Sequence, residues 1–420
     1  MEKMRIRGGP DLRLKGKVRI SGAKNAALPA IAAGLLTSGE IRLTNVPRVK
    51  DVHTILTLIE QLGGSATLDG GSVSVRVPRI TSDEASYELV RAMRASVLVL
   101  GPLLARFGKA AVALPGGCAI GSRPVDLHIS GLQKLGAKIS LEHGYIQAQA
   151  ERLCGAVIEF EKKTVTGTEN LLMAAALARG ETVLKNCAIE PEVTDLAVLL
   201  NKMGARIEWV GDDTARIEGV GELAGAEHAI IPDRIEAGTF LVAGALTGGD
   251  VLLTGVEPVH VRTVIDKLCA SGAVIESEGD DALRVYGSRE IKPQDVTTSP
   301  YPGFPTDMQA QFMVLMTQAQ GTSIITETIF DRRFSHVNEL LRLGAAIEVQ
   351  GDKAVVRGKT LLSGAEVTAT DLRASASLVL AGLIASGETV LSEIEHLDRG
   401  YERLEEKLRD LGASVERFAG

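Results

Sequence analysis

The sequence predicts an α/β protein made of six copies of one unit of about 70 residues. Three observations support this fold class: a glycine that recurs at a fixed place, an apolar segment before it and a hairpin pattern after it. The recurring glycines are 68 to 73 residues apart, at Gly63, Gly136, Gly204, Gly272, Gly344 and Gly412.

Each unit begins with a nearly all-apolar segment rich in small residues. Helices that are apolar on every face are buried. We therefore expect inner helices at residues 26–36, 171–178, 240–246 and 374–385.

A glycine, a short strand and an amphipathic helix come next. Strands are expected at residues 40–44, 181–185 and 388–391. Apolar side chains at helical spacing then predict an outer helix that ends at the shared glycine, which caps its C-terminus. Examples are Val52, Ile55, Ile59 and Leu62 in the first unit, and Tyr401, Leu404, Leu408 and Leu411 in the last.

A two-stranded hairpin completes the unit. Residues 65–68 and 72–77 flank Asp69-Gly70-Gly71, and residues 346–350 and 354–357 flank Gly351-Asp352. Crossovers of this kind imply sheets with parallel and antiparallel pairs, and six copies with inner helices suggest helices packed inside walls of sheet.

Composition limits the class of protein. A chain of 420 residues with 45% hydrophobic content has room for two or three domains. Its net charge of −7 and 3% aromatic content argue against a nucleic-acid surface. Residues 1–22 lack the apolar run of a signal peptide, and no segment has the ~20 apolar residues of a membrane span, so a soluble cytoplasmic protein is expected.

Cys118 is the most conspicuous candidate for chemistry. It lies among glycines with Arg123 five residues downstream, a setting that favours an exposed, reactive thiolate. The connection from Gly108 to Gly136 is 28 residues where other units have 24, so this loop is a lengthening of the kind that forms lids. The absence of a C-x-x-C pair argues against disulfide scaffolds and zinc sites, and we expect buried, apolar roles for Cys154, Cys187 and Cys269.

Polar residues gather at the starts of the expected inner helices. Helix N-termini suit anions, so a phosphate-binding cleft would form if the six starts converge. Acidic residues there are either N-caps or functional groups, and the sequence leaves both open. Basic residues oppose the helix dipole, which favours anion binding for them. The set is Lys24, Asn25, Arg94, Thr168, Glu169, Asn170, Asp233, Glu236, Asp307, Asp371 and Arg373.

Seven ordered motifs, from about Gly16 to the C-terminus, closely resemble the UDP-N-acetylglucosamine enolpyruvyl transferases. They lie at residues 22–29, 93–96, 118–128, 232–236, 304–311, 370–376 and 398–402. The resemblance implies two inside-out α/β barrels of three repeats each, with helices inside and sheets outside. One domain would hold residues 23–231 and the other residues 1–22 with 232–420.

The resemblance also implies a reaction. The enolpyruvyl group of phosphoenolpyruvate would move to the 3-hydroxyl of UDP-N-acetylglucosamine with release of phosphate, the first committed step of bacterial peptidoglycan synthesis. Cys118 would be the acid, able to form a covalent adduct and to react with fosfomycin, and Asp307 the base, with closure of the domains on binding. Further catalytic residues would be Lys24, Asn25, Asp371 and Arg399.

The two substrates would have separate sets of residues. Phosphoenolpyruvate would bind Lys24, Asn25, Arg123, Arg333, Arg373 and Arg399. The sugar nucleotide would bind Arg94, Arg123, Pro124, Val125, Asp126, Leu127, His128, Lys163, Thr164, Val165, Gly167, Asp307 and Ile329. No metal, organic cofactor, nucleic acid or membrane would take part. Residues 164–168 read Thr-Val-Thr-Gly-Thr where many members have Val-Ser-Val-Gly-Ala, so the diphosphate contacts of this segment differ from the common pattern.

Two alternatives stay open. The shikimate-pathway enolpyruvyl transferase shares the fold but lacks the cysteine loop. A catalytically silent sugar-nucleotide sensor would keep the fold without turnover, although Lys24, Cys118, Asp307 and Arg399 are all present. Phosphate release from phosphoenolpyruvate with and without the sugar nucleotide separates the three.

Overall fold

The computed structural model describes residues 2–114, 125–288 and 290–420, and the chain forms two compact units. Unit 1 contains Met1–Ser21 and Pro232–Gly420, and unit 2 contains the described residues between Gly22 and Ile231. The chain passes from unit 1 to unit 2 after Ser21 and returns after Ile231. Three predicted site residues, Cys118, Arg123 and Pro124, lie outside the described residues.

The described residues form six four-stranded sheets with one common arrangement. The first strand is parallel to the second, which is antiparallel to the third, which is antiparallel to the fourth. In unit 2 the sheets, in that order, are β14 (Ala226–Ala229), β3 (Glu40–Thr44), β5 (Ser72–Arg76) and β4 (Ser65–Asp69); β6 (Glu84–Ala85), β7 (Lys109–Ala113), β9 (Tyr145–Gln149) and β8 (Lys138–Glu142); β10 (Val157–Glu159), β11 (Glu181–Lys185), β13 (Thr214–Glu218) and β12 (Arg206–Val210).

The three sheets of unit 1 repeat this arrangement. They are β2 (Lys15–Arg19), β15 (Asp250–Thr254), β17 (Ala282–Tyr286) and β16 (Val274–Ser277); β18 (Val296–Thr297), β19 (Thr322–Thr326), β21 (Lys353–Arg357) and β20 (Ala346–Gln350); β22 (Glu366–Thr368), β23 (Gly387–Ser392), β1 (Glu2–Gly8) and β24 (Ser414–Ala419). The β3 and β11 strands and the two quoted hairpins lie within one residue of their predicted positions.

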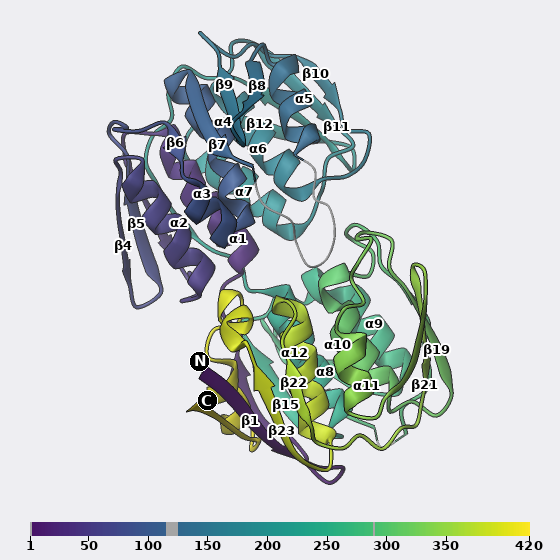
Figure 1. The fold of residues 1–420 in the computed structure, drawn as a ribbon. Coiled ribbons are helices and arrows are strands. Elements are labelled where there is room, and N and C mark those ends of the chain that lie inside the picture. Colours follow the sequence, from purple (N-terminus) through teal and green to yellow (C-terminus); the bar gives the residue numbers. More distant parts are fainter. Residues whose placement is uncertain (1, 115–124, 289) are drawn as a thin grey trace. The chain divides into compact units, whose positions relative to one another are not determined.

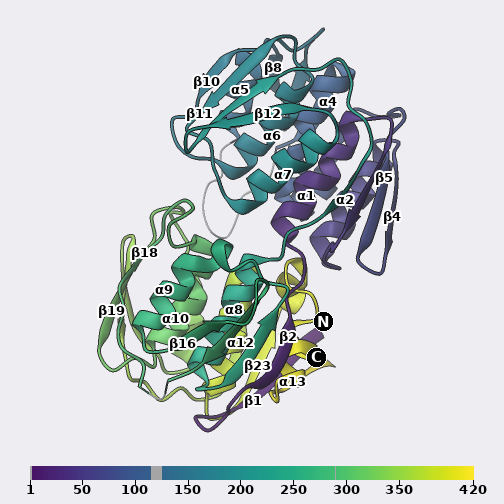
Figure 2. The ribbon, with the colours of Figure 1, turned by 180° about the vertical axis from the view of Figure 1, so that it is seen from behind.

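Strands from distant parts of the chain complete both units. In unit 2, β14 comes last in sequence but pairs in parallel with β3 near its start. In unit 1, the N-terminal β1 and β2 pair with β23, β24 and β15. The N-terminal segment therefore belongs to the same unit as the C-terminal half, and both chain ends lie in one sheet (Figure 2).

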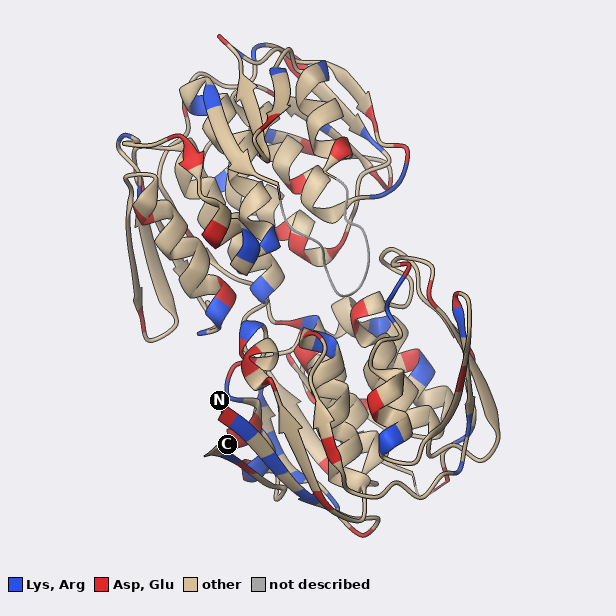
Figure 3. Ribbon diagram, in the orientation of Figure 1, with Lys and Arg blue, Asp and Glu red and all other residues tan. Residues whose placement is uncertain are grey.

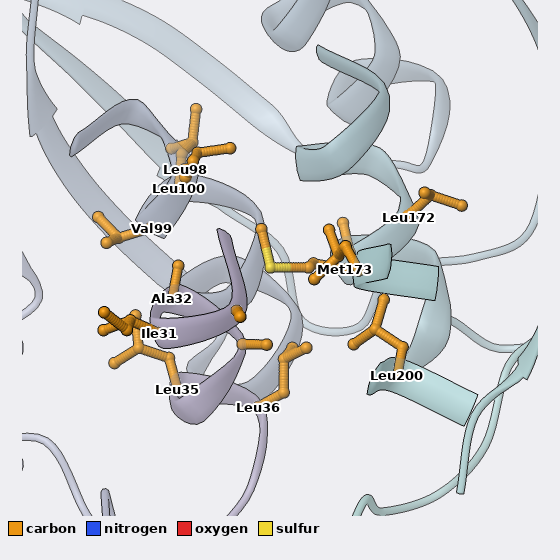
Figure 4. Packing of buried hydrophobic residues seen from close by; sticks show 14 of the residues in the cluster. Ile31, Ala32, Leu35, Leu36, Leu98, Val99, Leu100, Leu172, Met173 and Leu200 are labelled. Carbon is orange, nitrogen blue, oxygen red and sulfur yellow. The ribbon is translucent and has the colours of Figure 1, made fainter. Parts of the chain in front are cut away.

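Buried helices form the interior of each unit. In unit 1, α8 (Arg234–Leu246), α10 (Gln309–Met316) and α12 (Leu372–Ile384) pack against one another, with strands outside them (Figure 1). In unit 2, α1 (Lys24–Ala32) with the 3₁₀ turn η1 (Ala33–Leu36), η2 (Arg94–Val99) with α4 (Leu100–Phe107), and α6 (Val165–Ala176) play this part. Figure 4 shows their apolar side chains interlocking, among them Leu35, Val99 and Met173.

Outer helices cover the inner ones and end as the repeating glycine predicts. They are α2 (Lys50–Gln61), α3 (Tyr87–Ala92), α5 (Asp126–Lys134) and α7 (Pro191–Lys202) in unit 2, and η3 (Pro258–Val261) with α9 (Arg262–Ala270), α11 (Val337–Arg342) and α13 (Leu404–Asp410) in unit 1. All six repeating glycines have φ between 93° and 105°. That left-handed conformation just past a helix end favours glycine, so the C-cap prediction is confirmed.

Two expectations were wrong in detail. The last outer helix begins at Leu404 and excludes Tyr401, because Arg403 adopts a left-handed φ of 52° that interrupts the helix. Cys187 is buried as expected, but Cys154 and Cys269 are exposed. Cys269 lies on the outward face of the amphipathic α9, and Cys154 lies in a surface connection, so neither position is closed by packing. No helix among the described residues combines the length and apolar character needed to span a membrane.

Candidate active site

Unit 1 brings one carboxylate and two guanidinium groups together. Asp307 lies in the 3₁₀ turn η4 (Thr306–Met308), directly before the inner helix α10. Its Oδ1 accepts from Arg333 Nη2 at 2.7 Å, and its Oδ2 accepts from Arg373 Nη2 at 3.0 Å and Nε at 3.2 Å. Both arginines are buried while Asp307 is partly exposed. The cluster is net positive and can bind an anion such as a carboxylate or phosphate.

A buried polar network supports this cluster from below. The Tyr401 hydroxyl lies 2.9 Å from Thr239 Oγ1 and accepts from Gln311 Nε2 at 3.2 Å, and Gln311 Nε2 also donates to the Asp307 carbonyl at 3.0 Å. The Arg373 guanidinium lies over the Tyr401 ring, 5.4 Å from its centroid. Burial lowers the pKa of Arg373, but the charge of Asp307 more than compensates and the net pKa is raised. Arg373 therefore stays charged.

The structure decides between cap and function for the acidic residues at helix starts. Asp233 accepts from the backbone N–H groups of Ile235 and Glu236, and Asp371 accepts from those of Arg373 and Ala374. Both are N-caps. Asp307 makes no such cap and instead pairs with the two arginines. Among these three, Asp307 is the one whose carboxylate is not used to begin a helix.

Two further predicted residues belong to unit 1. Arg399 is the last residue of the 3₁₀ turn η5 (Ile394–Arg399) and is half-buried. Ile329 is exposed in the loop after β19, where its backbone N–H and that of Phe330 donate to Glu327 Oε1. Glu327 Oε2 also accepts from Thr306 Oγ1, which in turn accepts from Arg333 Nη1. Glu327 thus ties this loop to the arginine cluster.

In unit 2, the first residue of α1 carries a buried charge. Lys24 Nζ donates to Asp51 Oδ2 at 3.1 Å, and the two residues are only 8% and 3% exposed. Asp51 lies in the first turn of the outer helix α2, where its carboxylate is favoured by the helix dipole. A lysine at a helix N-terminus opposes that dipole, so Asp51 supplies the stabilisation that Lys24 needs.

The remaining predicted residues of unit 2 lie at the starts of three helices. Figure 3 shows that the inner helices carry few charges along their length. Asn25 is the second residue of α1, and Arg94 begins η2. The other segments are Val125, Asp126, Leu127 and His128 at the start of α5, and Lys163, Thr164, Val165 and Gly167 at the start of α6.

The α6 start is held by its own side chains. Thr164 is the N-cap and its Oγ1 accepts from the Gly167 N–H at 3.2 Å. Lys163 Nζ donates to Asp213 at 2.6 Å and to the Cys187 carbonyl at 2.9 Å. One turn inside the helix, Glu169 is fully buried, and burial with the nearby Glu192 and Glu190 raises its pKa well above the usual value.

Two buried histidines make the stability of the fold depend on pH. Burial lowers the pKa of His128 and of His336 to about 4 each, against an ordinary 6.5. The unfolded chain binds protons below pH 6.5 that the folded chain refuses, so stability should fall as the pH drops from 6.5 towards 4. Each histidine should account for up to about 3 kcal/mol of this loss.

Urea unfolding between pH 4 and 7.5 measures this dependence. Replacing either histidine by asparagine should flatten the curve in that range. An equally steep curve in both variants would assign the acid sensitivity to the carboxylates instead.

Sequence reasoning did not single out Asp51, Gln311, Thr239 or Glu327. Tyr401 was noticed only as an apolar helix position. Each of these residues acts through a partner that is distant in sequence, so no local spacing signals it. A charged residue inside the otherwise apolar stripe of an amphipathic helix, as at Asp51, was the one available sign.

Comparisons with known proteins agree over nearly the whole chain. Residues 10–408 match the family model of EPSP synthase (3-phosphoshikimate 1-carboxyvinyltransferase). A UDP-N-acetylglucosamine 1-carboxyvinyltransferase of Koribacter versatilis is 58% identical, covering 100% of this chain and 97% of the relative. Proteins of the same name from Acidobacterium capsulatum and Desulforapulum autotrophicum are each 57% identical, covering 100% and 99% of this chain and 96% and 100% of their own.

Solved structures have the same fold. The enolpyruvyl transferase NikO from Streptomyces tendae superposes with a TM-score of 0.89 at 28% identity, covering 99% of this chain and 98% of its own. EPSP synthase from Acinetobacter baumannii has a TM-score of 0.75 at 21% identity over 100% of both chains, which shows the fold alone. The chain therefore belongs to the EPSP synthase family of enolpyruvyl transferases, and within it to the UDP-N-acetylglucosamine 1-carboxyvinyltransferases.

Proposed function

We propose that this protein transfers the enolpyruvyl group of phosphoenolpyruvate to the 3-hydroxyl of UDP-N-acetylglucosamine and releases phosphate. The observation that carries this is full-length identity of 57–58% to three relatives with that name. The reaction is the first committed step of peptidoglycan synthesis, and we place it in the bacterial cytoplasm. The sheets and inner helices would arise from six copies of one unit, three in each inside-out barrel.

The chemistry needs an acid, a base and cations. A bond forms between the sugar O3 and C2 of phosphoenolpyruvate while C3 receives a proton, giving a tetrahedral intermediate. The bond from C2 to the phosphate oxygen then breaks, C3 loses a proton and phosphate leaves. Positive groups placed against the carboxylate and phosphate stabilise the charge that moves in both steps.

The roles divide between the two units. Asp307 would take the hydroxyl proton, and Cys118 would deliver the proton to C3. Arg333 and Arg373 would face the anionic groups of the intermediate, and Lys24, Asn25, Arg123 and Arg399 would hold phosphoenolpyruvate. Asp371 would act by capping α12 and so placing Arg373. The buried pairing of both arginines with Asp307 supports these roles, because it gives the base a fixed position and keeps the cations charged.

The sugar nucleotide would bind mainly in unit 2. Its diphosphate suits the N-termini of α5 and α6, where Val125 to His128 and Lys163 to Gly167 lie. Arg94 would add a cation there, and Asp307 and Ile329 would contact the sugar from unit 1. No metal or organic cofactor enters the proposal.

Phosphate release from phosphoenolpyruvate tests the function. Release is expected with UDP-N-acetylglucosamine, in the presence of EDTA, but not with shikimate 3-phosphate or without an acceptor. A Cys118→Ala variant should release none and should resist inactivation by fosfomycin. Release with shikimate 3-phosphate would identify the shikimate enzyme, and binding of the sugar nucleotide without any release would identify a sensor.

A further inference from the structure

A buried asparagine in α6 has its amide orientation determined by three partners. Asn170 is 0% exposed. Its Oδ1 accepts from the Gly101 N–H at 2.6 Å, and its Nδ2 donates to the Val97 carbonyl at 3.0 Å and to His128 Nδ1 at 2.9 Å. Because a backbone N–H only donates and a carbonyl only accepts, the amide cannot be turned over. A Cβ at position 101 would lie 2.2 Å from Asn170 Oδ1, so glycine there permits this close approach.

The Asn170 amide in turn determines the tautomer of His128. Nδ1 of the imidazole accepts the hydrogen bond, so in the neutral ring the proton is on Nε2. Nε2 then donates to Thr166 Oγ1 at 3.2 Å. His128 is 3% exposed, and burial lowers its pKa to about 4, so the ring is neutral at physiological pH.

The charged groups around His128 do not alter that state. Asp126, on the same helix, acts on its pKa in the raising direction, but burial dominates. The elements packed against α5 are α6, β8 and β10. Their charged residues are Glu169, Lys138, Glu142 and Glu159.

Thr166 is left with a hydroxyl proton to donate. Its oxygen already accepts from His128, and the described residues offer that proton no acceptor. Thr166 is half-buried in the first turn of α6, beside the N-cap Thr164, so its hydroxyl adds a donor to the exposed N–H groups of the helix.

We propose that Asn170 is a positioning residue that acts through His128 to make Thr166 a hydrogen-bond donor to the diphosphate of the sugar nucleotide. The proposal rests on the proposed function, which puts that diphosphate at the starts of α5 and α6. It assigns a role to Asn170 and Thr166 that no local motif indicates. It also accounts for a hydroxyl at position 166, where many relatives of this type have valine.

Asn170→Asp reverses the relay. A carboxylate still accepts from Gly101, but it also accepts from His128, so the neutral imidazole must move its proton to Nδ1. Nε2 then accepts, the Thr166 proton turns inward, and the diphosphate meets only lone pairs. The new carboxylate also raises the pKa of His128. Once protonated, the ring donates from both nitrogens and the Thr166 donor is restored.

The dissociation constant of UDP-N-acetylglucosamine, and of UDP, measured by calorimetry without phosphoenolpyruvate from pH 5.5 to 8.5, tests this relay. The wild type should show no titration from His128. Asn170→Asp should bind about tenfold more weakly at pH 8.5, the effect of one hydrogen bond to a charged group, and should recover as the pH falls. Weakening that is the same at every pH would overturn the proposal.

Two variants separate the relay from a loss of folding. Thr166→Val should weaken binding about tenfold at all pH values, and adding Asn170→Asp to it should cause no further loss. Asn201→Asp is the matched control, because Asn201 also bonds a backbone N–H and carbonyl, those of Ile207, but no histidine. A pH-dependent loss in that control would overturn the proposal.

Nitrogen NMR of His128 reads the tautomer without any substrate. The proton should be on Nε2 in the wild type and on Nδ1 in Asn170→Asp at high pH. Wild-type protein with this tautomer but no binding of UDP-N-acetylglucosamine would refute the proposed function and, with it, the role of the relay. Wild-type protein that binds and turns over while Nδ1 carries the proton would refute the relay alone.

Discussion

Replacing Asp307 by asparagine should lower kcat about 10²- to 10⁴-fold, the range for loss of a general base. The amide keeps the size of the side chain but cannot take the hydroxyl proton. It also leaves the buried Arg333 and Arg373 without the carboxylate that both contact at 2.7 to 3.0 Å. We therefore expect a lower thermal midpoint as well.

Steady-state kinetics and thermal unfolding of the same preparation separate these effects. Asp266→Asn is the matched control, since Asp266 pairs with Arg262 on the exposed surface of α9 and should change neither quantity measurably. Measurable turnover at more than a tenth of the wild-type rate would exclude Asp307 as the base.

Replacing Lys24 by methionine should reduce kcat/KM for phosphoenolpyruvate by at least about 10²-fold, because one charge-assisted donor to the substrate is removed. Asp51 would then hold a buried charge without its lysine partner. Breaking a buried pair in this way costs about 3–5 kcal/mol of unfolding free energy.

The double variant Lys24→Met/Asp51→Asn distinguishes the two roles of Lys24. Removing the second charge should restore most of the stability while activity stays lost. Recovery of activity together with stability would show that Lys24 serves only the fold. Lys24→Arg, which keeps the charge, should retain more stability than Lys24→Met.

Local patterns predicted much of the fold because they report backbone geometry directly. The six repeating glycines occupy a left-handed conformation that other residues avoid, and the hairpins alternate as half-buried strands do. All-apolar segments became inner helices for the same reason, since nothing on any face of them suits water.

Local patterns failed where one residue or one distant partner decided the outcome. The reversed φ at Arg403 separates Tyr401 from α13, and Tyr401 instead lies beneath Arg373. Cys154 and Cys269 were expected to be buried from average behaviour, but each lies at a surface position of its own element. Asp51 and Gln311 matter because of Lys24 and Asp307, which their local sequence does not reveal.

By itself, the sequence determined the α/β class, the strands and helices of the repeating unit and the identity of most candidate groups, because these follow from residue type and spacing. Only the tertiary structure decided that Asp233 and Asp371 cap helices while Asp307 pairs with Arg333 and Arg373. It also decided which proton His128 carries. The physical reason is that the charge and hydrogen-bonding state of a buried group depend on partners that packing brings from distant segments.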